Sequence, residues 1–337
     1  MGRFNKFLFV FLTFVVGNIL SLTSQAAGIE RGLSVMVLGS GGPAAHRTGR
    51  ASAGYLIFVD RKPRILLDAG GGTYQRLAAS GADIKDLELV LLSHLHIDHT
   101  ADLSSIIKTM YFHNRAAKTY RKTPLEIIGP GANGKPFPPS FANANSAQYP
   151  ATSEFIDGHY HINTGVQRYL HVFAPAISGG EFHYSTKDVV SDVTLPMQTV
   201  YDKAGLVIKA VGVVHGPVPA LAYRIEYKGK VLVYSGDTSS ASDNMISLAK
   251  DADLLIYDTA VMDDLPNGPQ DKVFFALHTT PTRMGQVAAR AGARVLVLSH
   301  ITPVTGPRLA QVKKRVESQG YRGRIDVARD LGIFNLH

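Results

Sequence analysis

Short apolar runs recur along the chain, and several of them end directly in aspartate or histidine. Nine runs have the length and the β-branched or aromatic composition of buried strands: LSVMVL (33–38), YLIFVD (55–60), RILLD (64–68), LELVLLS (87–93), GLVIKAV (205–211), LAYRIEY (221–227), KVLVYSG (230–236), DLLIYD (253–258) and RVLVLSH (294–300). Helical patterns lie between several of these runs. Such an alternation predicts an α/β fold.

Three helices follow from periodicity and end signals. In segment 101–113 the apolar residues recur at the i, i+3, i+4, i+7 spacing of one buried helix face. A second apolar pattern begins near Met284 and stops at Gly292, and a third helix is predicted between Pro307 and Gly320. The stretch 131–200 breaks this rhythm, since it is rich in Pro, Asn, Ser and Gly. It is interpreted as an elaborated insertion in one domain.

The N-terminal segment has the pattern of a secretory signal peptide. Arg3 and Lys6 precede the apolar run FLFVFLTFVVGNILSL, and Ser24 and Ala26 follow at the spacing of a cleavage site. We expect residues 1–26 to be removed and the protein to be secreted or periplasmic, without stable membrane association afterwards. An uncleaved membrane anchor is the alternative, for which the run is slightly short.

Composition constrains the stability and the partners of the chain. Its 337 residues are 45% hydrophobic, enough to bury a substantial core, and include no cysteine, so disulfides cannot hold the fold. The formal charge is +8, and the loss of Arg3 and Lys6 leaves +6. A basic surface favours an anionic substrate, although it equally serves solubility.

Histidine and aspartate are concentrated where predicted strands end, the edge at which α/β sheets present ligand-binding groups. The seven residues are His94, His96, Asp98, His99, His215, Asp237 and His300. Side chains alternate along an extended segment, so His94 and His96 leave the backbone on the same side and can meet one ion. Asp98 and His99 fall where the next helix starts and point elsewhere. This spacing suits two adjacent metal ions.

The motif His-x-His-x-Asp-His, followed by a distant His, Asp and His, resembles the metallo-β-lactamase superfamily, a four-layer αββα sandwich. The likeness runs from about Leu33 to the C-terminus, apart from the insertion, and implies one hydrolase domain over residues 30–337. It implies His94, His96 and His215 on a first metal ion. Asp98, His99 and His300 would hold a second ion, with Asp237 bridging.

Two divalent ions are therefore expected, zinc first, although manganese or iron tolerates the same ligands. The resemblance also implies that Asp68, in LLDAGGGT, orients a metal ligand. The alternative for Asp68 is a turn-forming residue before three glycines.

Within the superfamily, the segment from Leu277 to Pro303 resembles the ribonuclease Z and arylsulfatase-like branch. His278 matches the histidine of that branch's motif, and Asp258 stands where ribonuclease Z has a glutamate. A carboxylate beside an imidazole raises its basicity, so this pair could protonate a leaving group. With Asp98, His278 and Asp258 form the predicted catalytic set.

Nucleic acid is not an expected partner. Ribonuclease Z reaches transfer RNA with a basic arm, whereas segment 131–200 here has more acids than cations: Lys135, Arg168 and Lys187 against Glu154, Asp157, Glu181, Asp188 and Asp192. The basic run at 115–122 is the contrary evidence. Aromatic and histidine residues of the insertion are instead interpreted as pocket walls or as an edge strand: His159, Tyr160, His161, Tyr169, His171 and Phe173.

The function predicted from the sequence is a secreted dinuclear hydrolase that cleaves aryl sulfate or phosphate esters. The substrate would be a small anionic or ester compound, and a homodimer is left open. The alternatives are a lactone hydrolase, a ribonuclease Z-type endoribonuclease and a metal-binding protein without turnover.

Overall fold

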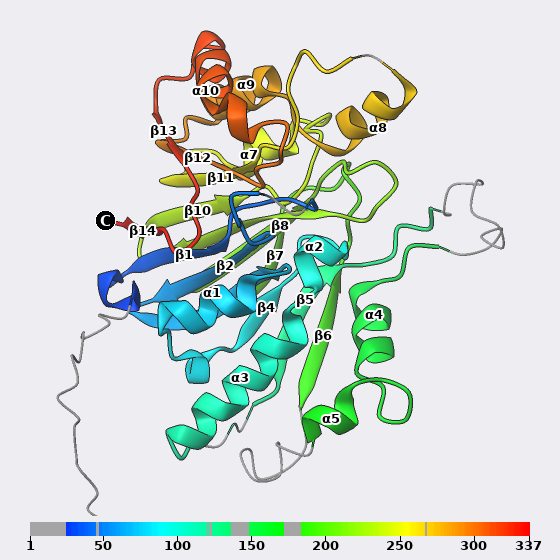
Figure 1. The fold of residues 1–337 in the computed structure, drawn as a ribbon, viewed down its shortest axis with the longest axis vertical. Coiled ribbons are helices and arrows are strands. Elements are labelled where there is room, and N and C mark those ends of the chain that lie inside the picture. The colour runs from blue at the N-terminus through cyan, green and yellow to red at the C-terminus, as the bar shows by residue number, and fades with distance from the viewer. Residues whose placement is uncertain are drawn as a thin grey trace, which may run out of the picture.

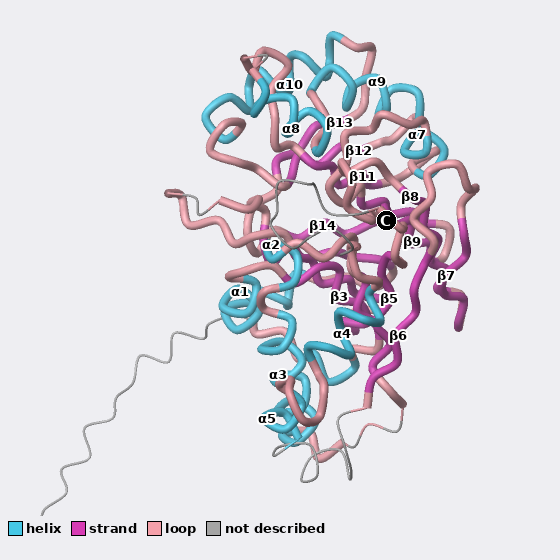
Figure 2. The backbone as a smooth tube through the Cα atoms, turned by 90° about the vertical axis from the view of Figure 1, so that its right-hand side faces the viewer, coloured by secondary structure: helices cyan, strands magenta, loops and turns pink. Residues whose placement is uncertain are grey.

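Two β-sheets lie face to face, and helices cover the outer face of each (Figures 1 and 2). The structure is a computed structural model that describes residues 25–44, 47–119, 121, 123–135, 148–171, 183–266 and 268–337. The predicted αββα sandwich is confirmed. Residues 1–24 of the predicted signal peptide lie outside the described part of the chain. The described residues Gln25–Gly28 form a short 3-10 helix. No helix in the described ranges is both long and apolar enough to cross a membrane.

The first sheet has seven strands in the order β14-β1-β2-β3-β4-β5-β6. Strand β1 pairs antiparallel with β14 and β2, and β2 with β3, while β3 to β6 run parallel. The bounds are β1 (Leu33–Gly39), β2 (Gly54–Val59), β3 (Lys62–Ala69), β4 (Leu89–Leu91), β5 (Leu125–Pro130), β6 (Tyr184–Val189) and β14 (Ile333–Leu336).

The second sheet repeats this plan with seven strands in the order β13-β12-β11-β10-β9-β8-β7. Strands β7 to β10 pair antiparallel, and β10 to β13 run parallel. The bounds are β7 (Gln198–Lys203), β8 (Leu206–Gly212), β9 (Leu221–Tyr227), β10 (Lys230–Tyr234), β11 (Leu254–Asp258), β12 (Val295–Ser299) and β13 (Arg324–Val327).

Helices α1 to α5 lie on the side of the first sheet, and α7 to α10 on the side of the second (Figure 1). Their bounds are α1 (Thr73–Ser80), α2 (Ile97–Thr100), α3 (Leu103–Ala116), α4 (Thr152–His159), α5 (Gln167–His171), α7 (Asn244–Leu248), α8 (Pro269–Leu277), α9 (Pro281–Ala291) and α10 (Leu309–Ser318). Short 3-10 helices span Ile84–Asp86 and Gly306–Arg308.

Three hydrophobic cores fill the spaces between the four layers. Along β1, Val35 and Val37 face the core between the sheets, whereas Met36 and Leu38 face the core under the helices. The third core packs the second sheet against α7, α9 and α10. Strands buried on both faces have no polar side to expose, which is why they appear in the sequence as continuous apolar runs.

Segment 131–200 is only partly an addition to the sandwich. It contains α4 and α5, but β6 pairs with β5 at the edge of the first sheet, and β7 begins at Gln198. Strand β6 was not predicted from the sequence, because YSTKDV is mostly polar and only Val189 is buried. Residues 136–147 and 172–182 lie outside the described part of the segment.

Candidate active site

The strand ends bring the predicted site residues together at one edge of the sandwich. His94 follows β4 and Asp98 opens α2, while Asp237 and His300 follow β10 and β12 of the other sheet. His215 follows β8, which runs in the same direction as β10. All of these strands end at the same edge, so neither sheet builds the site alone.

The first donor set consists of His94, His96 and His215, whose ligand atoms lie within 4.8 Å of one another. His96 Nδ1 is 2.9 Å from His94 Nε2 and 3.3 Å from His215 Nε2. His215 Nδ1 donates to the carbonyl oxygen of Leu277 at 2.8 Å. That bond places the proton on Nδ1 and leaves Nε2 with a free lone pair toward the other rings.

The second donor set consists of Asp98, His99, Asp237 and His300. His300 Nε2 lies 3.2 Å from Oδ2 of both Asp98 and Asp237. His99 Nε2 is 3.4 Å from Asp98 Oδ2 and 3.5 Å from Asp237 Oδ2. The same Asp237 oxygen is 3.9 Å from His94 Nε2. Asp237 therefore stands between the two donor sets.

Unpaired buried atoms show that these residues fit a cation. His99 Nε2 and Asp237 Oδ1 are buried without a hydrogen-bond partner. Buried polar atoms are almost always satisfied, and a site of imidazole nitrogens and carboxylate oxygens is typical of zinc and related ions. The His and Asp groups are thus positioned to bind metal.

The pKa shifts of the first donor set agree with that role. Burial, with nearby His99 and His215, lowers the pKa of His94, and burial lowers the pKa of His215 to about 4. Both imidazoles are therefore neutral, as metal ligands must be. Burial also lowers the pKa of His300, but the carboxylates of Asp237, Asp98 and Asp258 outweigh it and raise the pKa to about 10. A divalent cation would balance this carboxylate charge.

Asp68 holds His99 in place. Asp68 Oδ2 accepts from His99 Nδ1 at 2.8 Å and from the hydroxyl of Tyr234 at 2.8 Å, while Oδ1 accepts from the Ser93 amide at 2.7 Å. Its φ of 54° fits the turn interpretation, but the buried side chain is fully engaged. His300 has the same φ of 54°, in the left-handed region that residues other than glycine adopt uncommonly.

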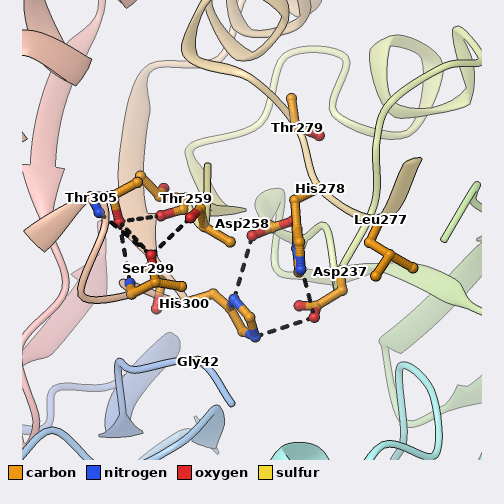
Figure 3. Close-up of polar contacts among 12 residues, drawn as sticks. Gly42, Asp237, Asp258, Thr259, Leu277, His278, Thr279, Ser299, His300 and Thr305 are labelled. Carbon is orange, nitrogen blue, oxygen red and sulfur yellow. Dashed lines mark hydrogen bonds and ion pairs between the residues drawn. The ribbon is translucent and has the colours of Figure 1, made fainter. Parts of the chain in front are cut away.

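Asp258 and His278 form a buried pair beside the second donor set (Figure 3). His278 Nδ1 donates to Asp258 Oδ2 at 2.8 Å, and it lies 4.0 Å from Asp237 Oδ2. The other oxygen of Asp258 is 3.5 Å from His300 Nδ1. Burial lowers the pKa of His278, but the Asp258 carboxylate outweighs it and raises the pKa above its usual value. The pair can therefore carry a proton at the edge of the metal-binding cluster.

Sequence reasoning missed several groups that support the site. Ser93 and Tyr234 donate to Asp68, which holds His99, and the Leu277 carbonyl accepts from His215. A serine, a tyrosine and a backbone carbonyl carry no distinctive signal in the sequence. The glycine-rich turn after β1 also packs against the site. A Cβ on Gly42 would lie 2.8 Å from Cε1 of His300, so this turn must pack without side chains against a site residue.

A cavity of about 220 Å³ adjoins the first donor set, lined by Leu95, His96, Pro130, Tyr149, Pro150, Phe155, Val218 and Pro219. The aromatic residues expected to form a pocket lie elsewhere. Tyr160 is buried under the first sheet, Tyr169 is 79% exposed, and His159 ends α4 rather than forming an edge strand. The side chains of His171 and Phe173 lie outside the described part of the chain.

The family model described as the metallo-beta-lactamase superfamily matches residues 47–300. The chain belongs to the metallo-beta-lactamase superfamily. Ribonuclease Z of Mycobacterium bovis (strain BCG / Pasteur 1173P2) is 29% identical over 311 residues, which cover 90% of this chain and 99% of that relative. Ribonuclease Z of Mycobacterium marinum is 28% identical over the same length, with the same shares covered.

Solved structures share the fold. The metallo-beta-lactamase fold protein YhfI from Bacillus subtilis has a TM-score of 0.60 and 23% identity, with 90% of this chain and 98% of that chain covered. The short form of human tRNase Z has a TM-score of 0.61 and 20% identity, with 90% and 99% covered.

The chain is thus a metal-dependent hydrolase of this superfamily, which confirms the predicted class of enzyme. The expectation that nucleic acid is no partner is wrong, because relatives matched over nearly their whole length are ribonucleases. That expectation relied on the charges within 131–200 and gave less weight to the basic run at 115–122. Phosphate-binding groups can come from any segment that the fold brings to the surface.

Proposed function

We propose that the chain is an RNA phosphodiesterase of the ribonuclease Z type. The buried Asp258–His278 pair beside Asp237 carries the proposal, because it places a proton donor next to the cluster that binds metal. The ribonuclease Z relatives, matched over 99% of their length, support RNA as the substrate. Small aryl esters, the substrates expected from the sequence, become the second candidate.

Two divalent ions would complete this site, zinc first. His94, His96 and His215 would hold one ion, and Asp98, His99 and His300 the other, with Asp237 shared. When bound, such ions supply Lewis-acid polarisation of a phosphoryl oxygen and activation of water. The expectation of two ions rests on the number and type of the ligands, and these ligands allow manganese or iron as well as zinc.

The chain's own contribution to the chemistry is to hold and move a proton. In hydrolysis, water attacks phosphorus, the bond from phosphorus to the leaving ribose oxygen breaks, and that oxygen must gain a proton. His278 is held at Nδ1 by Asp258, so Nε2 is the atom that can donate. The Asp258 charge keeps the ring protonated until the leaving oxygen takes the proton.

Cleavage of defined RNAs tests the proposal. The chain without residues 1–26 would be incubated with a precursor transfer RNA carrying a 3′ trailer, with an unstructured RNA and with a DNA of the same sequence. We expect endonucleolytic cleavage of RNA that needs divalent metal and is lost in His278→Ala but kept in His161→Ala, whose ring is exposed and contacts Thr164. Turnover of aryl sulfates or acyl lactones with no RNA cleavage would overturn it.

A specific observation supports the second candidate. The cavity beside His96 is mainly apolar, with Tyr149 and Phe155 among its walls. Such a cavity suits an aryl group of a small sulfate or phosphate ester. The same assays with p-nitrophenyl sulfate and bis-(p-nitrophenyl) phosphate compare the two candidates by kcat/KM.

We also propose that the protein is exported, on the evidence of residues 1–26 alone. Fractionation of cells that express either the full chain or a chain beginning at Ala27 tests this. Activity in the periplasm or medium only for the full chain supports export, and equal distribution of the two forms contradicts it.

A further inference from the structure

An arginine-lined cavity lies outside the metal-binding cluster. Its volume is about 230 Å³, and its walls are Thr48, Gly49, Arg50, Arg76, Arg329 and Asp330. These residues come from three separate segments, namely the loop after β1, helix α1 and the loop before β14. The sequence therefore gives no sign that three arginines meet here.

The cavity carries a net positive charge. Asp330 is the one acid among its walls, and its carboxylate is already engaged by Arg76 Nε at 2.9 Å, by the Ser40 hydroxyl at 2.7 Å and by the Ala51 amide at 2.8 Å. Among the described residues, no carboxylate lies within 4.0 Å of the guanidinium of Arg50 or Arg329. Three arginines against one aspartate leave two positive charges without a partner.

The guanidinium groups of Arg50 and Arg329, which have no carboxylate partner among the described residues, repel one another. Burial lowers the pKa of Arg50, and the Arg329 charge lowers it further, while Asp330 opposes both. Arg50 is fixed by bonds from its Nη1 to the Ser40 hydroxyl at 2.6 Å and to the Ala328 carbonyl at 2.8 Å. Arg329 is exposed. An anion between them would relieve this repulsion, and guanidinium groups bind phosphate by paired hydrogen bonds.

Residues Ser40 and Gly42, after β1, link this cavity to the active site. Asp330 accepts from the amide of Ser40, whose own carbonyl accepts from the amide of Ile301, the residue after His300. Two residues after Ser40, Gly42 lies against the His300 ring. A polyanion placed across the metal-binding cluster could therefore continue past Gly42 and Ser40 to the arginines.

We propose that Arg50, Arg76 and Arg329 hold a backbone phosphate of the RNA substrate, away from the bond that is cleaved. This assignment rests on the proposed function and places the phosphate contact outside segment 131–200. Arg50 and Arg76, which are held by hydrogen bonds, form the fixed wall of the subsite, and exposed Arg329 supplies a third guanidinium to the phosphate. The contact is electrostatic and independent of base sequence.

Equilibrium binding of a fluorescent RNA tests the subsite. Every protein carries His278→Ala so that the RNA is not consumed, and Arg329→Gln is compared with Arg322→Gln. Arg322 is a matched control, because it is an exposed arginine between α10 and β13, and within the described part of the chain its guanidinium hydrogen-bonds one group, the Glu317 carbonyl. We expect Arg329→Gln to weaken binding several-fold at about 0.1 M salt. The slope of log affinity against log salt should fall by about 0.7 to 0.9, the loss of one phosphate contact.

Activity assays separate this proposal from the proposed function. With His278 intact, Arg329→Gln should leave kcat/KM for bis-(p-nitrophenyl) phosphate unchanged, since that diester does not reach the cavity. If the wild type cleaves RNA but Arg329→Gln binds RNA like Arg322→Gln, the subsite is wrong and the function stands. A wild type that neither binds nor cleaves RNA overturns both. Stabilisation by inorganic phosphate that depends on Arg329, with RNA affinity unchanged, would instead show a site for free phosphate.

Discussion

At the scale of single residues, the geometry of the site depends on which ring nitrogen of each histidine is hydrogen-bonded to a supporting group. His99 gives Nδ1 to Asp68, and His215 gives Nδ1 to the Leu277 carbonyl. In both rings the hydrogen bond fixes the tautomer and turns Nε2 toward the centre. The sequence motif shows that histidines are present, but it does not show these partners.

Replacing Asp68 should weaken metal binding without unfolding the protein. All four groups around its carboxylate donate, so in Asp68→Asn the amide nitrogen must face a donor. We expect metal affinity to fall about 10- to 100-fold, as for other partners of ligating histidines. Chelator competition measures this.

Asp102→Asn is the matched control for that change. Asp102 also accepts backbone amides, from Gly72 and Tyr74, but it contacts no ligand. Equal metal affinity in the two variants would show that Asp68 supports the fold only.

Removing His278 should affect substrates according to their leaving groups. As the proton donor, His278→Ala should leave metal content unchanged and lower turnover about 100- to 10,000-fold for RNA, whose ribose oxygen leaves poorly without a proton. The loss should shrink for p-nitrophenol, which departs as an anion. Asp258→Asn should give a smaller loss in the same direction. An equal loss for both kinds of leaving group would rule out proton donation.

At the scale of elements, the sequence predicts most strands that are buried on both faces and misses the strands at the sheet edges. All nine predicted strands are present, because core strands show continuous apolar runs. The four edge strands, β6, β7, β13 and β14, have mostly polar, exposed or half-buried residues, and none of them was expected. The buried strand β5 was also missed, because its apolar run in LEIIGP is short and interrupted by Glu126. The metal ligands were predictable because they follow core strands. The contacts of Tyr234 and of the Leu277 carbonyl were not, because they depend on tertiary packing.

The contact between the His215 loop and α8 gives a prediction at this scale. Gly216 has a φ of 56°, and a Cβ there would lie 2.9 Å from Cδ2 of Leu277, at the end of α8. Gly216→Ala should therefore strain the backbone by about 1–2 kcal/mol and also displace the segment that carries His278. We expect a lower kcat together with lower stability, measured by kinetics and denaturant unfolding.

Gly205→Ala separates these two effects. Gly205 has a φ of 78°, but a Cβ there meets nothing within 4 Å. This variant should lose similar stability and keep the wild-type kcat. A normal kcat in Gly216→Ala would show that the position of α8 does not matter for catalysis.

At the scale of the whole molecule, the metal-binding cluster bridges two sheets that each supply part of the ligands. His94, His96 and His99 come from the first sheet, and Asp237 and His300 from the second. Bound ions would thus tie the sheets together, and their binding free energy would add to the stability of the folded state.

Metal removal should therefore destabilise the entire chain. We expect elemental analysis to find about two divalent ions per chain, because seven ligands can complete two sites with open positions for water. Free metal at 100 times Kd should stabilise the fold by about 2.7 kcal/mol, seen as a higher Tm than after chelation. At most one bound ion across several metal supplements would contradict the dinuclear centre.

Tyrosine hydroxyls also join the sheets, independently of metal. Tyr55 on β2 is 2.6 Å from the Ser299 hydroxyl on β12, and Tyr223 on β9 donates to the Leu92 carbonyl at 2.8 Å. Tyr234 on β10 donates to Asp68 on β3 at 2.8 Å. Each hydroxyl reaches from one sheet to a group of the other. Only the Tyr234 bond ends on a residue that positions a metal ligand.

Tyr234→Phe should consequently affect both stability and metal binding. The lost bond ends on a carboxylate, so its removal should lower the free energy of unfolding by about 1.5–3 kcal/mol. The Asp68 carboxylate would keep Ser93 and His99, so metal affinity should fall less than in Asp68→Asn. Tyr227→Phe is the control, because it loses a bond to Asp60, which is more exposed and touches no ligand. If both variants lowered metal affinity equally, the effect would come from general loosening of the sandwich. A loss confined to Tyr234→Phe would show that the alignment of the two sheets sets the geometry of the second donor set.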